Sequence, residues 1–295
     1  MRFHYIHSYW VTKLFYFFRK TNKKIAFLPF CDDLFNLGFL EDKVYLCSIK
    51  FFRMTTVFKE YLDKHNYSNF DLKAVLFDMD GVLYDSMKWH AKSWKETMDH
   101  FDISSTSEEF YLYEGMVGSQ TINHLMNREK GRDATLQEKE SIYKLKTELF
   151  SKYNDGSLIP YAYDFVKKLH DEGLVCAVVT GSGQPTLINK LEHNFPSLFK
   201  KEHVVTAFDV KNGKPHPEPY LMGLAKVGNL KTNQAVVVEN APRGVEAAVA
   251  AGIFTIAINT GPMPDKILAD AGANIVLPSM KALFDSWDEY QKSLI

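Results

Sequence analysis

Short apolar runs and longer amphipathic segments alternate along most of the chain. The apolar runs are rich in β-branched residues and lie at residues 74–77, 174–179, 203–207, 235–238, 253–258 and 274–277. Helical periodicity occurs between the later runs, at residues 162–172, 184–194, 217–227 and 242–251. Strands that alternate with helices of about 10 to 15 residues are typical of parallel sheets with right-handed crossovers. The pattern therefore predicts an α/β fold with a Rossmann-like, doubly wound parallel sheet at its core.

One long segment interrupts this alternation. Residues 86–158 contain amphipathic helices, for example at 88–101 and 136–153, and no convincing strand. An insertion of this size after the first strand would form a separate lobe over the strand ends. We therefore predict an all-α helical cap domain at residues 85–159, inserted into a core formed by residues 69–84 and 160–295.

The first 53 residues differ from the rest in composition. They hold ten of the 22 phenylalanines and nine Lys or Arg against four Asp or Glu, and neither helical nor strand periodicity is sustained. Basic residues beside aromatic ones are typical of an amphipathic membrane or partner anchor. We favour the alternative of an extension over residues 1–68 that is poorly ordered or comes from sequence upstream of the true start, with Met54 as the initiator.

The overall composition narrows the function classes. The chain has 46% apolar and 24% charged residues, as in ordinary soluble globular proteins, and its net charge of −1 gives no basis for binding nucleic acid or an anionic membrane. No apolar run reaches the roughly 18 residues of a membrane span. Cys31, Cys47 and Cys176 lack metal-ligand spacing, and their odd number argues against a disulfide framework. We expect a cytoplasmic protein in a reducing compartment, with no nucleic-acid or membrane partner.

Polar clusters follow four of the predicted strands. They are Asp78 with Asp80, Thr180-Gly181-Ser182-Gly183, Lys214 in a Gly-Lys-Pro turn, and Glu239-Asn240. Reactive groups in open α/β sheets lie at the carboxyl ends of the strands. Buried carboxylates are costly unless they are paired or bind a metal, which indicates that the two aspartates serve chemistry. Hydroxyls and backbone N–H groups before a helix can bind phosphate oxygens.

Each cluster alone also has a purely structural interpretation. Asp-x-Asp-Gly resembles part of a calcium loop, although its Gly comes too early and no Glu closes the loop. The segment from Thr180 to Gly183 could be a turn, Lys214 a solvated side chain and Glu239-Asn240 a helix cap. Four such clusters in order after successive strands favour a single functional site.

The order of these motifs resembles the haloacid dehalogenase superfamily over residues 70–292. The resemblance rests on Asp-x-Asp-Gly-Val-Leu, Thr-Gly-Ser, Gly-Lys-Pro and Glu-Asn-Ala-Pro-x-Gly-Val-Glu-Ala-Ala. These segments look like the β-phosphoglucomutase-like subfamily with a helical cap, and the whole sequence is most similar to its capped inorganic pyrophosphatases.

The resemblance implies phosphoryl transfer through an aspartyl-phosphate. Asp78 would be the nucleophile, ionised at its ordinary pKa of about 3.9. Asp80 would act as general acid and then as base, which requires a raised pKa. The residues that would hold the phosphoryl oxygens are Thr180, Gly181, Ser182 and Lys214.

The resemblance also implies Mg²⁺ as the cofactor. Its ligands would be Asp78, the backbone carbonyl of Asp80, and Asn240. Glu239 would orient a metal-bound water or Lys214 without touching the ion. The subfamily commonly has Glu-Asp where this chain has Glu239-Asn240, so one negative charge is missing. The cap residue Glu114 would replace it when the cap closes.

The cap residues decide between substrates. Three of them are candidates for contact with the substrate: His90, Lys146 and Tyr143. Of these, His90 and Tyr143 could instead pack in the interior of the helical cap. A phosphomutase cap usually presents an Arg to the distal phosphate, whereas residues 113–118 hold neither Arg nor Lys. A small pocket closed by Glu114 favours a compact, highly charged substrate.

We therefore predict a Mg²⁺-dependent phosphohydrolase, either an inorganic pyrophosphatase or a small phosphate-ester phosphatase. Its partner would be a small phosphorylated substrate or pyrophosphate, and the protein would act as a monomer. A β-phosphoglucomutase-type sugar phosphomutase is one alternative. A non-catalytic binding module on the same fold is another.

Overall fold

Six parallel strands form the centre of the molecule. The computed structural model describes residues 56–182 and 185–294, so the expectations for residues 1–53 lie outside the described part. The strands are β1 (Ala74–Phe77), β2 (Val175–Val179), β3 (Val204–Val205), β4 (Ala235–Glu239), β5 (Phe254–Ile258) and β6 (Ile275–Leu277). Their order is β3-β2-β1-β4-β5-β6, with every pairing parallel. The predicted doubly wound α/β sheet is confirmed.

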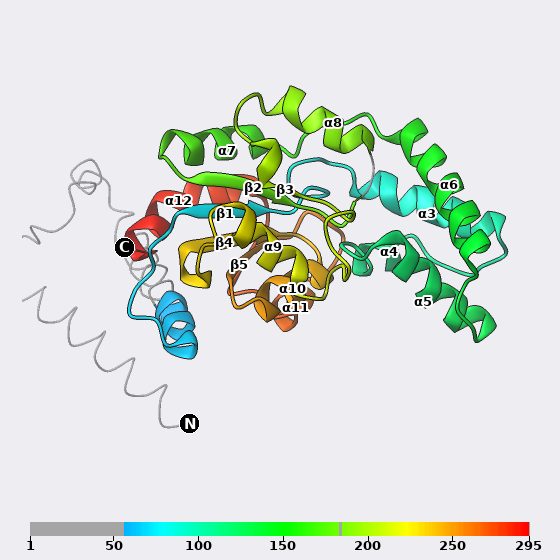
Figure 1. Ribbon diagram of the computed structural model, residues 1–295, viewed down its shortest axis with the longest axis horizontal. Coiled ribbons are helices and arrows are strands. Elements are labelled where there is room, and N and C mark those ends of the chain that lie inside the picture. Colours follow the sequence, from blue (N-terminus) through cyan, green and yellow to red (C-terminus); the bar gives the residue numbers. More distant parts are fainter. Residues whose placement is uncertain (1–55, 183–184, 295) are drawn as a thin grey trace, which may run out of the picture. The chain divides into compact units, whose positions relative to one another are not determined.

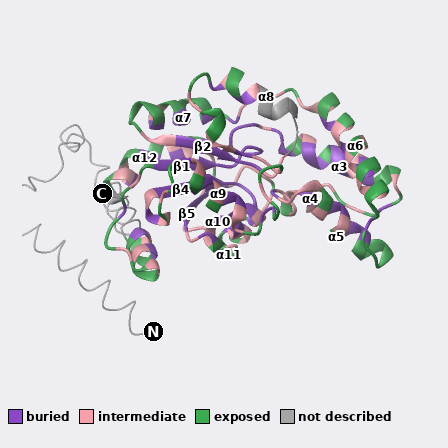
Figure 2. Ribbon diagram, in the orientation of Figure 1, coloured by how far each residue is buried: buried purple, intermediate pink, exposed green. Residues whose placement is uncertain are grey.

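Helices cover both faces of this sheet (Figure 1). One face carries α7 (Ala162–Asp171), α8 (Pro185–Asn194) and α12 (Met280–Leu294), and the other carries α9 (Glu218–Lys226), α10 (Pro242–Ala250) and α11 (Asp265–Asp270). Alternate residues of β1 enter the two cores, Val75 and Phe77 on the α7 side and Ala74 and Leu76 on the α9 side. The sheet is therefore apolar on both faces, which is why its strands read as continuous apolar runs. Figure 2 shows the strands mostly buried and the outer faces of the helices exposed.

The first four of the five α-helices between β1 and β2 pack on one another and form the cap. They are α3 (Met87–His100), α4 (Glu109–Leu112), α5 (Gly118–Lys130) and α6 (Leu136–Tyr153). Their separate hydrophobic cluster includes Trp94, Met98 and Ile122. Helix α6 begins at a capping box, in which Thr135 Oγ1 accepts the Glu138 N–H and Glu138 accepts the Thr135 N–H. The inserted all-α cap is confirmed as a fold feature, while its exact boundaries remain predictions.

The expectation of an extension over residues 1–68 is wrong for residues 56–65. These residues are helical, and Phe58 and Tyr61 are buried in the main core. The Phe58 ring stacks on Phe254 with centroids 4.6 Å apart, and Tyr61 donates a hydrogen bond of 2.8 Å to the Gly252 carbonyl. Two aromatics three positions apart share one helix face, so this short helix can bury both against the sheet.

The predicted strand at 203–207 is shorter than expected, and α12 was not predicted. Residues Lys201–His203 form a 3-10 helix, and Asp209 accepts the Thr206 N–H in a turn, which leaves Val204–Val205 as strand. Side-chain hydrogen bonding by Asp and Thr competes with the strand ladder at such positions.

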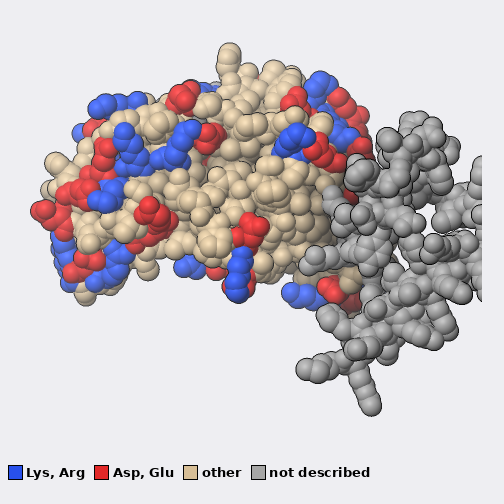
Figure 3. Space-filling model, turned by 180° about the vertical axis from the view of Figure 1, so that it is seen from behind, with Lys and Arg blue, Asp and Glu red and all other residues tan. Residues whose placement is uncertain are grey.

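The described residues form no membrane-crossing helix, and the face drawn in Figure 3 has no extended patch of a single charge. None of the helices in residues 56–182 and 185–294 is both long and apolar enough to cross a membrane. Basic and acidic side chains are interspersed on the face in Figure 3. Ion pairs between residues of the same helix occur among the described residues, as in Lys95 with Asp99 at 2.5 Å.

Candidate active site

Three of the four predicted clusters meet directly at the carboxyl ends of the strands. Asp78 follows β1, Glu239 ends β4, and Lys214 comes from the loop between β3 and α9. The Lys214 ammonium lies 2.6 Å from Asp78 Oδ1, 2.6 Å from Glu239 Oε1 and 3.0 Å from the Val179 carbonyl oxygen. All three charged side chains are buried. The two carboxylates raise the pKa of Lys214 despite the opposing effect of burial, so this lysine is a permanent positive charge.

The turn after β1 packs closely against Asn240, the residue that follows β4. Gly81 has φ +83°, and a Cβ there would overlap the Asn240 amide. A glycine is therefore required by both conformation and space. Thr260, after β5, donates a 2.6 Å hydrogen bond to the Gly81 carbonyl and holds this turn in place.

Three buried oxygens at this point have no hydrogen-bond partner. They are Asp78 Oδ2, Asp80 Oδ2 and Asn240 Oδ1. Buried polar atoms are normally paired, and orphaned carboxylate and amide oxygens are ligands that a hard divalent cation prefers. These residues therefore fit Mg²⁺. Within the described residues, no group of three or more His, Cys, Asp or Glu side chains lies close enough together to hold a metal ion.

The pKa values of the two aspartates are the reverse of the expectation. Burial, with Glu239 and Asp80 nearby, raises the pKa of Asp78 to about 7, although Lys214 opposes this. Asp80 is equally desolvated, but His90 and Ser86 outweigh burial and lower its pKa. The expected raised pKa of Asp80 is therefore wrong for the metal-free protein, because two donors stabilise its charged form.

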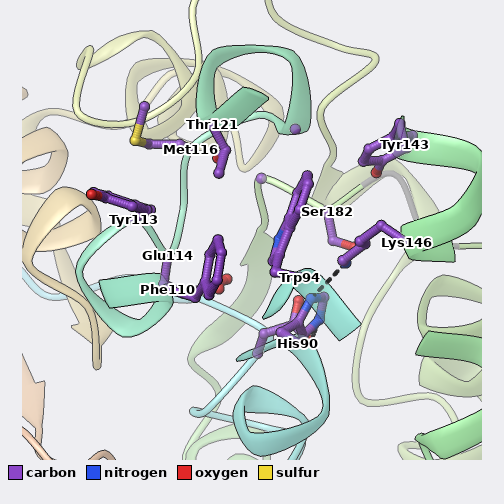
Figure 4. Close-up of a pocket in the computed structure, with 13 residues that line it drawn as sticks. His90, Trp94, Phe110, Tyr113, Glu114, Met116, Thr121, Tyr143, Lys146 and Ser182 are labelled. Atoms are coloured by element: carbon purple, nitrogen blue, oxygen red, sulfur yellow. Dashed lines mark hydrogen bonds and ion pairs between the residues drawn. The ribbon is translucent and has the colours of Figure 1, made fainter. Parts of the chain in front are cut away.

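A chain of polar contacts runs from Asp80 into the cap. Ser86 Oγ donates to Asp80 Oδ1 at 2.5 Å, and His90 Nε2 lies 3.1 Å from the same oxygen. Lys146 Nζ lies 2.8 Å from His90 Nδ1, and Figure 4 shows the two side chains directed at one another. Burial lowers the pKa of Lys146 to about 8 and also lowers that of His90. With Nδ1 accepting from Lys146, the neutral ring has its proton on Nε2 and donates to Asp80.

Glu114 faces the aspartates from the cap side. It lies in the loop between α4 and α5, and burial together with Asp80 and Asp78 raises its pKa well above the ordinary value. The cavity that it lines with His90, Tyr143 and Lys146 holds only about 30 Å³. Such a space accommodates one or two water molecules. The cap loop is therefore closed over the aspartates.

Glycines on both sides permit this closure. A Cβ on Gly181 would lie 2.5 Å from the Gly115 carbonyl oxygen, and one on Gly115 would lie 2.9 Å from Lys214 Cδ. Gly181 and Ser182 also line the cavity, and Thr180 Oγ1 accepts the Ser182 N–H at 2.9 Å. The cap loop thus rests on the turn that we expected to bind phosphate.

Three residues of the site were not identified from the sequence. Ser86 donates a hydrogen bond to Asp80, Thr260 donates to the Gly81 carbonyl, and Tyr220 donates to Glu239 at 2.7 Å. Ser86 could have been found as the polar residue at the start of the next helix. Nothing in the helical pattern distinguishes Tyr220 from a core aromatic.

Comparisons with known proteins identify the family of this chain. Residues 75–258 match the family model of the haloacid dehalogenase-like hydrolases. Hexitol phosphatase A of Escherichia coli is 31% identical over 63% of this chain and 83% of its own length. The phosphorylated carbohydrates phosphatase of Thermotoga maritima is 30% identical over 68% and 92%, respectively.

Among solved structures, a Bacteroides vulgatus protein provisionally named a beta-phosphoglucomutase is similar over 82% of this chain and 98% of its own. The two share 50% identity with a TM-score of 0.79. The β-phosphoglucomutase-like resemblance is confirmed, and the chain belongs to the haloacid dehalogenase-like hydrolases.

Proposed function

We propose that this protein is a Mg²⁺-dependent phosphohydrolase that acts through an aspartyl-phosphate on Asp78, with inorganic pyrophosphate as its preferred substrate. The relatives of this chain include phosphatases and a phosphomutase, and phosphoryl transfer is the chemistry that these enzymes share. The observation that carries the finer assignment is the carboxyl of Glu114 facing Asp78 and Asp80 across a cavity of about 30 Å³. Because this closed space holds only one or two water molecules, a compact substrate requires less displacement of the cap loop than a sugar ring.

The core residues supply the first half of the reaction. An oxygen of Asp78 forms a bond to phosphorus while the bond from phosphorus to the leaving oxygen breaks. The Lys214 ammonium, 2.6 Å from Asp78, offsets the repulsion between the carboxylate and an anionic substrate. In the second half, a water oxygen bonds to phosphorus while Asp80 accepts a proton from that water. The bond from phosphorus to the Asp78 oxygen breaks, and inorganic phosphate leaves.

The low pKa of Asp80 favours an anhydride over an ester. A sugar alkoxide is a strong base and needs a proton from a general acid as it leaves, whereas phosphate is a much weaker base. An Asp80 held ionised by His90 and Ser86 is better suited to the weaker demand. Lys146, whose pKa is lowered to about 8, is held in its charged form by a bound anion and supplies the cation for the departing phosphate.

Mg²⁺ would be held by Asp78 and Asn240, whose orphaned side-chain oxygens fit it, together with the backbone carbonyl of Asp80. When bound, it neutralises charge on the substrate and keeps Asp78 ionised. Glu239 is fully hydrogen-bonded to protein donors, which supports a role in orienting neighbours.

The closest alternative is a sugar phosphomutase. Relatives named for beta-phosphoglucomutase favour it. The relative named as a phosphorylated carbohydrates phosphatase instead favours hydrolysis of a sugar phosphate. Residues 113–118 nevertheless offer no cation to a distal phosphate. A non-catalytic binding module requires loss of the nucleophile or the acid, and both aspartates are present.

A substrate panel tests the proposal. Phosphate release with Mg²⁺ is measured on pyrophosphate, several sugar phosphates and an aryl phosphate, with Asp78→Asn and chelated metal as controls. We expect the highest kcat/KM on pyrophosphate and no release in either control. Conversion of β-glucose 1-phosphate to glucose 6-phosphate faster than any phosphate release would establish the mutase instead, and no turnover of any compound would favour the binding module.

A further inference from the structure

Tyr220 lies directly behind the lysine of the site. It is the third residue of α9 and is completely buried. Its hydroxyl donates a 2.7 Å hydrogen bond to Glu239 Oε1, and the Lys214 ammonium lies 5.0 Å from the centre of its ring. Tyr220 thus contacts both members of the Lys214–Glu239 ion pair and does not line the cavity.

Every acceptor position of Glu239 is used. Oε1 accepts from Lys214 and Tyr220, while Oε2 accepts from the backbone N–H groups of Asn240 and Ala241 at 2.9 and 3.1 Å. A carboxylate has about four such positions. Helix α10 packs closely against this carboxylate, because a Cβ on Gly244 would overlap Glu239 Oε1. The carboxylate is fixed in one orientation.

Lys214 has likewise committed all of its protons. Its three N–H groups go to Asp78, Glu239 and the Val179 carbonyl. A phosphoryl oxygen can bind this ammonium only if one of these acceptors releases it. If Glu239 is the acceptor that releases Lys214, Glu239 Oε1 still accepts the hydrogen bond from the Tyr220 hydroxyl. Without the tyrosine hydroxyl, the buried oxygen would depend on Lys214 alone and would hold it back.

We propose that Tyr220 is a positioning residue for phosphate binding: its hydroxyl satisfies Glu239 so that the Lys214 ammonium can turn toward the phosphoryl group. This inference rests on the proposed phosphoryl transfer at Asp78. Tyr220 does not touch the substrate. Its effect is exerted through Glu239.

The test compares Tyr220→Phe with a matched loss of a buried hydroxyl elsewhere. Tyr61→Phe is the control, since Tyr61 donates to the Gly252 carbonyl in the core. Binding of inorganic phosphate with Mg²⁺ is measured by calorimetry on the full chain, below the unfolding transition of each variant. We expect Tyr220→Phe to raise the Kd of phosphate about tenfold, the size of one hydrogen bond to a charged group. Tyr61→Phe should leave that Kd unchanged.

Kinetics separate positioning from general damage. The interaction is made equally with bound substrate and transition state, so KM should rise about tenfold in Tyr220→Phe while kcat changes little. Equal Kd and KM in Tyr220→Phe and the wild-type protein, with only a loss of thermal stability like that of Tyr61→Phe, would overturn the inference.

A double-mutant cycle adds a second test. If Tyr220 acts through Glu239, then Tyr220→Phe in a Glu239→Gln background should add little to the loss of phosphate binding. Fully additive losses would overturn the proposed route. Should the wild-type protein bind phosphate but turn over no substrate, the proposed function would fail while the phosphate measurements would still decide the role of Tyr220.

Discussion

The site contains two buried lysines, one from each side, and their environments are opposite. On the core side, Lys214 lies 2.6 Å from each of two carboxylates, which raise its pKa. On the cap side, Lys146 contacts the neutral His90 ring and lies 4.7 Å from the centre of the Phe150 ring, and burial lowers its pKa to about 8. The core lysine is neutralised by the protein, whereas the cap lysine still lacks a close anion.

This difference divides the labour between the two halves. The core brings Asp78, Lys214 and Glu239 into one hydrogen-bonded network that is formed before any ligand arrives. The cap presents Lys146 and Glu114 to a small cavity, where their charges depend on what binds. We infer that the core determines the reaction and the cap determines the substrate.

The largest expected effect comes from removing the nucleophile. Asp78→Asn keeps the shape of the side chain but cannot form the aspartyl-phosphate, so kcat should fall by on the order of 10⁴-fold or more for every substrate. Asp99→Asn on the exposed face of α3 is the matched control and should retain wild-type rates. Retained turnover in Asp78→Asn would exclude the proposed nucleophile.

An intermediate effect is expected from blocking the contact between the halves. Gly181→Ala places a methyl group 2.5 Å from the Gly115 carbonyl oxygen. The cap loop must then move away, and displacement of about 1 Å can reduce kcat on the order of 10²-fold. Steady-state kinetics and thermal unfolding should show lost activity with nearly unchanged stability. Normal activity would mean that the closed contact is not needed.

A smaller effect is expected from the cap lysine. Lys146→Met should raise KM for pyrophosphate about tenfold, roughly one charged contact of 1.4 kcal/mol. The pKa of Lys146 falls from 10.5 in the unfolded chain to about 8 in the folded protein, so between these pH values the unfolded chain binds more protons. Burying the charged lysine therefore costs stability below about pH 8, and that cost disappears toward pH 10.5.

The wild-type protein should accordingly gain stability relative to Lys146→Met as the pH rises through this interval. Comparing Tm values of the two proteins by calorimetry from pH 8 to 10.5 checks the sign. A Tm difference that does not change with pH would contradict the lowered pKa.

The sequence was sufficient for the sheet and for bringing the clusters together, because apolar runs and strand-end residues follow from local pattern. Asp78, Lys214 and Glu239 do meet where that pattern placed them. The sequence could not predict which aspartate has the raised pKa. That depends on the positions of Ser86, His90 and Lys214, which tertiary packing determines. Residues 56–65 were misassigned because the compositional break nearby concealed the two aromatics that pack on the sheet.

Glu114 tests most directly whether the cap selects the substrate. The measurement is kcat/KM for pyrophosphate and for an aryl phosphate, over a range of Mg²⁺, in wild-type protein, Glu114→Ala and the exposed control Glu108→Ala. We predict that Glu114→Ala lowers the pyrophosphate value about tenfold or more and raises the Mg²⁺ requirement, while the aryl phosphate value changes little. Unchanged pyrophosphate turnover and Mg²⁺ dependence in Glu114→Ala, or an equal loss on both substrates, would contradict the account.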